Sequence, residues 1–62
     1  MKEIARVQRG KNNMETARAF AKCEAFRWCS IADIIATMRV YQNDGLLIFT
    51  DTEAIMYHNC DN

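Results

Sequence analysis

The length of the chain sets the first limit on its fold. Its 62 residues are expected to form a single domain (1–62), and a chain near this size buries only about 60% of the surface that its unfolded form exposes. Such a domain is marginally stable and usually needs a disulfide, a metal, a partner subunit or unusually good packing. Half of the residues are apolar and none is proline, which favours a compact core over disorder. Size alone therefore makes association with a partner or a second copy an expectation.

Local patterns in the first half of the chain predict a strand followed by a helix. Residues 3–9 mix small apolar residues with charges and are expected to form a short edge strand or an ordered arm. A loop follows, in which Asn12 or Asn13 can cap a helix by accepting a backbone N–H bond. Residues 14–29 have strong helix formers and an apolar stripe at intervals of three and four. The stripe consists of Met14, Ala17, Ala21, Ala25 and Trp28.

A second helical pattern follows, and its end is ambiguous. Ser30, with Asp33 three residues later, resembles a capping box. Apolar residues then recur at the i, i+3, i+4 and i+7 positions of a helix, namely Ile31, Ile34, Ile35 and Met38. Residues 34–41 are also rich in β-branched and aromatic residues, which favour strands. We therefore expect the helix to end near Thr37.

Two turn signals divide the rest of the chain. Asn43-Asp44-Gly45 is typical of a tight turn, and residues 46–50 after it should form a strand. Residues 50–53 are a second turn candidate before an expected strand at 54–58, although Asp51 can instead cap a short terminal helix. The predicted fold is α+β, with an N-terminal strand or arm, a helical segment at about 14–37 and a small antiparallel sheet at about 38–58. The alternative is a mostly helical fold with one hairpin.

The residue types offer little for catalysis or metal binding. Cys23, Cys29, His58 and Cys60 form a Cys₃His set, but five residues separate the first two cysteines, more than is usual between paired zinc ligands. The close pair His58 and Cys60 stands near the end of the sequence, where an enclosing pocket is rarely built. We expect a protein that is not an enzyme and has neither metal nor cofactor, with its cysteines as reduced apolar fillers.

Targeting signals are not visible in the sequence. The first residues include no long apolar run, and no window approaches the roughly 20 apolar residues that cross a bilayer. An odd number of cysteines, 3, fits a reducing compartment. The expectation is a cytoplasmic protein without a membrane partner.

The apolar run at residues 46–49 predicts a contact surface. It is apolar on both faces of a strand because successive side chains point in opposite directions. If one layer of helices covers one face of the sheet, the other face keeps apolar groups that mark an interface; alternatively, both faces are covered internally. The residues assigned to this interface are Tyr41, Leu47, Phe49, Ile55 and Tyr57. We thus predict a protein-interaction module that self-associates, as a homodimer, or inhibits a larger protein, a type that phages and mobile elements often encode.

Charge supports an alternative function. Positions 1–27 hold seven basic and three acidic residues, whereas positions 28–62 hold one basic and five acidic residues. The candidate phosphate-binding patch is Arg6, Arg9, Lys11, Arg18, Lys22 and Arg27. The helical pattern from Ser30 and the Asn43-Asp44-Gly45 turn resemble the passage from recognition helix to wing in winged-helix proteins. That resemblance implies a small nucleic-acid-binding transcriptional regulator. Against it, residues 31–38 carry no basic side chain, and the acidic second half would repel a duplex.

Overall fold

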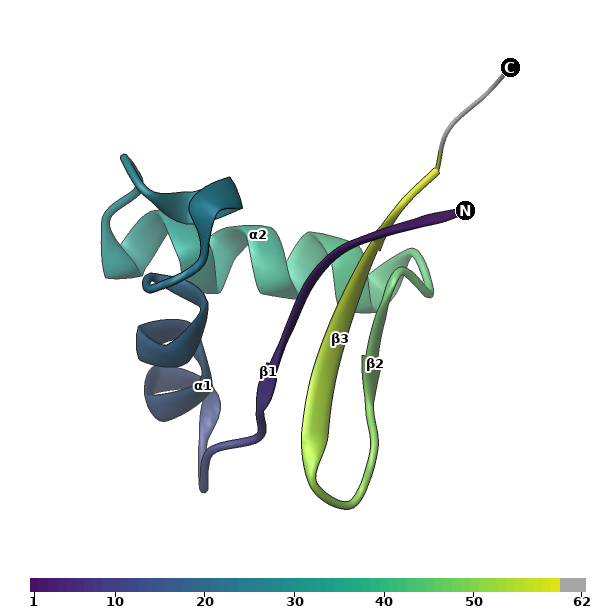
Figure 1. Cartoon of the computed structure of the whole chain (residues 1–62), viewed down its shortest axis with the longest axis horizontal. Helices are drawn as coiled ribbons and strands as arrows, with labels where there is room; N and C mark the ends of the chain where they lie inside the picture. Colours follow the sequence, from purple (N-terminus) through teal and green to yellow (C-terminus); the bar gives the residue numbers. More distant parts are fainter. Residues whose placement is uncertain (60–62) are drawn as a thin grey trace.

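The computed structural model describes residues 1–59 as two helices and a three-stranded antiparallel sheet (Figure 1). The elements in chain order are β1 (Lys2–Gln8), α1 (Asn13–Phe20), a 3₁₀ turn η1 (Glu24–Phe26), α2 (Ile31–Asn43), β2 (Leu47–Phe49) and β3 (Glu53–His58). The N-terminal segment is a strand, and the α+β prediction is confirmed. Because residues 53–58 form β3, the option of a terminal helix capped by Asp51 is wrong.

The helical part differs from its prediction in the middle and at the end. Instead of one segment at about 14–37, α1 and α2 are separate helices with η1 between them. α2 runs to Asn43, so the second and third strands occupy residues 47–58 and the sheet does not begin at about 38. Met38 is buried and Tyr41 packs against the core. Burial at helical spacing thus continues past Thr37 and outweighs the strand preference of residues 34–41.

Polar side chains fix where each helix begins. Asn12 caps α1, because its side-chain oxygen accepts a hydrogen bond from the Glu15 N–H at 2.9 Å. The Glu15 carboxylate in turn accepts a bond from the Lys11 N–H at 3.0 Å. Ser30 caps α2 by accepting from the Asp33 N–H at 3.1 Å. Of the two asparagines considered from the sequence, Asn12 is the cap, and the cap at Ser30 is confirmed.

The sheet places the first strand of the chain beside the last. Its strand order is β1-β3-β2, so the central β3 pairs antiparallel with both neighbours. Met56 of β3 lies between Ala5 of β1 and Leu47 of β2 in this register. The pairing shifts between Glu3 and Ala5, and such bulges discourage a strand edge from pairing with another chain. Closing the sheet therefore requires a contact between segments about fifty positions apart, which local sequence patterns cannot show.

The core lies between the helices and one face of the sheet, which we call the helix-side face. α1 packs against β1, α2 packs against β2, and the two helices pack against each other (Figure 1). The largest fully buried apolar side chains are Phe20, Ile34, Met38 and Met56. Phe26 of η1 meets Phe20 edge on, with ring centres 5.6 Å apart. These two phenylalanines anchor the segment between the helices to the core.

The buried side of the first helical region is not the predicted stripe. Thr16, Ala17 and Phe20 are the buried residues of α1, whereas Met14 is 47% exposed and Trp28 is 90% exposed. α1 ends at Phe20, so positions beyond it no longer follow one helical surface. Trp28 therefore lies outside the core, at the surface.

Candidate protein-interaction surfaces

The five residues predicted to form one interface lie on different sides of the structure. Leu47 is 3% exposed and belongs to the core, and Phe49 and Tyr41 pack against that core. Ile55 and Tyr57 alternate with the core residues Ala54 and Met56, so they belong to the opposite, uncovered face of the sheet. The expectation that Leu47 and Phe49 remain on the uncovered face is thus corrected. Their register with Met56 and Ala54 turns them toward the helices.

Ile48 is the β2 residue on the uncovered face. It lies opposite Ile55, which in turn lies opposite Arg6, so these three form a row across the sheet. Ile48 is 44% exposed, whereas Ile55 in the central strand is 6% exposed. Ile48 is not among the interface residues predicted from the sequence. Its position follows from the alternation of side chains along a strand, because it stands between Leu47 and Phe49, which face the helices.

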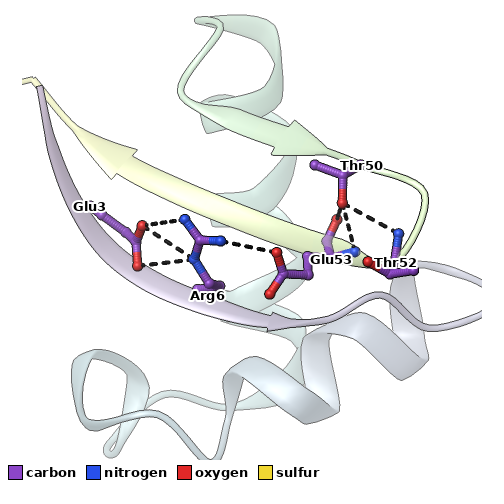
Figure 2. A network of polar contacts seen from close by, with 5 residues as sticks. All are labelled: Glu3, Arg6, Thr50, Thr52 and Glu53. Carbon is purple, nitrogen blue, oxygen red and sulfur yellow. Dashed lines mark hydrogen bonds and ion pairs between the residues drawn. The ribbon is translucent and has the colours of Figure 1, made fainter.

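A polar network lies across the same uncovered face. Figure 2 shows the Arg6 guanidinium between two carboxylates, 2.9 Å from Glu3 Oε1 and 3.0 Å from Glu53 Oε1. The hydrogen bond from Arg6 lowers the pKa of Glu3 below its usual value, and the bond to Glu3 raises the pKa of Arg6. Exposed ion pairs of this kind add little stability. These charges change the character of the surface more than its stability. The Arg6 side chain and its two carboxylate partners lie beside Ile55, where an apolar partner would have to bind.

Arg9 has a structural contact at the tip of the β2–β3 hairpin. Its Nη1 donates to the Thr50 carbonyl at 2.9 Å, and its guanidinium lies 5.1 Å from the ring centre of Phe49. The Thr50 hydroxyl accepts bonds from the backbone N–H groups of Glu53 at 2.8 Å and Thr52 at 3.3 Å (Figure 2). Arg9 thus joins the end of β1 to a turn that is already organised by Thr50.

The six basic residues considered from the sequence lie in different parts of the structure. Arg6 belongs to the network on the uncovered sheet face, and Arg9 holds the hairpin tip on the helix side. The Arg27 guanidinium lies 5.5 Å from the ring centre of Trp28, with a long 3.8 Å contact to Glu24. The remaining members are exposed and make no ion pair within residues 1–59: Lys11, Arg18 and Lys22. One continuous patch of all six is therefore not formed.

α2 presents an apolar surface to solvent, which we call the outer face of α2: Ala32, Ala36 and Val40. These residues are spaced by four, and Val40 is 57% exposed. The buried residues Ile34 and Met38 each stand two positions from Ala36, a rotation of about 200°, so they point to the other side of the helix. No other segment of residues 1–59 covers the outer face, because all three of its residues are exposed.

Charged and aromatic side chains border the outer face of α2. Asp33 and Arg39 are exposed and flank it on opposite sides of the helix axis, three residues before and three after Ala36. Trp28 stands two residues before the cap Ser30, beside the amino end of the helix, and its 90% exposure is the largest of any big apolar side chain within residues 1–59. The sequence pattern placed Trp28 in an apolar stripe, and this face of α2 was not among the predicted surfaces. The sequence does contain a sign of this face, because Ala32, Ala36 and Val40 recur every four residues on the side of the helix opposite Ile34.

The cysteines and the surface hollows give no sign of a chemical site in the described part of the chain. Cys23 is half-buried and Cys29 is exposed, both as free thiols, and Cys60 lies outside the described residues. Among residues 1–59, no three His, Cys, Asp or Glu side chains gather as metal ligands do. Two shallow hollows of about 360 and 180 Å³ lie beside β1 and at the amino end of α1. The helices described here are too short and too polar to cross a membrane.

Comparisons with protein-family models, with curated proteins and with solved structures gave no significant match to this chain. Function is therefore argued from the surfaces of the molecule.

Proposed function

We propose that this protein is a small, non-enzymatic, cytoplasmic protein-interaction module that acts by self-association or by inhibiting a larger protein. The observation that carries the proposal is an exposed apolar surface, formed by the outer face of α2 together with Trp28. Exposed apolar side chains rimmed by polar residues are typical of interfaces, and tryptophan is enriched among residues that dominate binding energy. The free thiols of Cys23 and Cys29 support a reducing compartment.

Two surfaces compete for this role, and the α2 surface is the better candidate. On the uncovered face of the sheet, the central Ile55 is already buried and the Arg6 network supplies charges that are paired within the chain. On α2, by contrast, Val40 and Trp28 project large apolar groups with no covering segment in residues 1–59. Burying those groups against a partner removes more apolar surface from water at a smaller cost in polar desolvation.

The native fluorescence of Trp28 provides the test, because it is the only tryptophan in the sequence. Emission and iodide quenching should be measured from low micromolar to millimolar protein, alongside mass by analytical ultracentrifugation. We expect the emission to shift to shorter wavelength, and quenching to fall, as the mass rises. Val40→Glu should keep the protein monomeric with Trp28 exposed, whereas Ile48→Glu, on the uncovered sheet face, should associate as the wild type does. A wild type that stays monomeric, with Trp28 fully quenchable at every concentration, contradicts self-association.

The second candidate is the nucleic-acid-binding regulator, and one observation favours it. α2 is followed by the β2–β3 hairpin, the order that the resemblance to winged-helix proteins requires, and Arg18 and Lys22 are exposed. The helix that would enter a groove is poorly suited to this, since α2 carries one basic residue, Arg39, and exposes Asp33 beside its alanines. We expect duplex DNA to bind no tighter than the non-specific level of roughly 10⁻⁴ to 10⁻⁶ M at physiological salt. Submicromolar binding that is lost in the double variant Arg18→Glu/Lys22→Glu would place this function first.

A further inference from the structure

We draw no further inference here: the strongest candidate, the exposed apolar outer face of α2 with Trp28 beside its amino end, is the surface of the proposed function, and nothing in the structure of residues 1–59 shows what covers it.

Discussion

Replacing Thr16 by Val tests how the loop after β1 is joined to α1. Thr16 is 1% exposed, and its hydroxyl makes two hydrogen bonds that connect this loop to the helix. The hydroxyl donates to the Asn12 carbonyl at 3.1 Å and accepts from the Gly10 N–H at 3.0 Å. Valine has nearly the same shape, so the substitution keeps the packing and removes both bonds. The Gly10 N–H then loses its acceptor at a partly buried position.

The size of the effect follows from the cost of an unsatisfied donor. Hydrogen bonds of this kind contribute about 0.5–1.5 kcal/mol each, and leaving a buried group unpaired costs about 1–3 kcal/mol. We expect Thr16→Val to lower the free energy of unfolding by about 1–3 kcal/mol, from a total of roughly 3–9 kcal/mol for a chain of this length. At about 4–8 °C per kcal/mol, the melting temperature should fall by roughly 5–20 °C.

Thr16→Ser is the matched control. It keeps the hydroxyl and removes one methyl group, which costs about 0.8 kcal/mol in transfer free energy. Both variants and the wild type should be unfolded by urea and by heat at one fixed, dilute concentration, because association raises apparent stability. Thr16→Val should be the less stable variant. If Thr16→Val is as stable as the wild type, or more stable than Thr16→Ser, then the hydroxyl does not hold the loop and the prediction is wrong.

Three further predictions concern the backbone and the polar network. A Cβ added at Gly10 would lie 2.5 Å from the Glu15 Cβ, so Gly10→Ala should destabilise by about 1–3 kcal/mol in urea unfolding. Gly45 has a φ of 75° with open space around it, so Gly45→Ala should cost about 1 kcal/mol from backbone strain alone, and Gly45→Asn less. The Arg6 hydrogen bond lowers the folded-state pKa of Glu3, so its small stabilisation is present above the ordinary value of 4.5 and is lost as the pH falls through the lowered pKa. Glu3→Gln should remove that part of the acid dependence and leave the pH profile flatter below 4.5 in melts from pH 2 to 7.

Local chemistry made part of the fold predictable. The caps at Asn12 and Ser30 depend on side chains within three residues of the bonds that they make, and the turn at Gly45 depends on one residue with positive φ. The end of α1 is different. Residues 21–23 contain neither glycine nor proline, and Ala21 and Lys22 are good helix formers, so nothing local stops the helix. The helix ends where Phe20 of α1 and Phe26 of η1 pack together in the core, which is a tertiary effect.

The interaction surface was harder to predict than the fold, for two physical reasons. Residues 46–49 are all apolar, so alternation could not tell which of them face the helices, and only pairing with β3 places Ile48 on the uncovered face. Trp28 continued an apolar stripe in the sequence, yet it lies beyond the point where the helix ends. A large apolar residue is normally assigned to the core, and its exposure depends on contacts that a linear pattern does not contain.

The oppositely charged halves of the chain meet within the fold. β1 from the basic half pairs with β3 from the acidic half, and the ion pair between Arg6 and Glu53 joins those two strands. Part of the opposite charge of the two halves is therefore paired within one molecule, and Asp33 and Arg39 are the charges that border the outer face of α2. Self-association through this largely apolar face should therefore change the dissociation constant only a few-fold between 50 and 200 mM salt. A protein that neutralises six to ten phosphates loses about 10³- to 10⁵-fold in affinity over the same range. Salt dependence thus distinguishes the two proposed functions without any variant, and a steep loss of duplex binding would favour the nucleic-acid regulator.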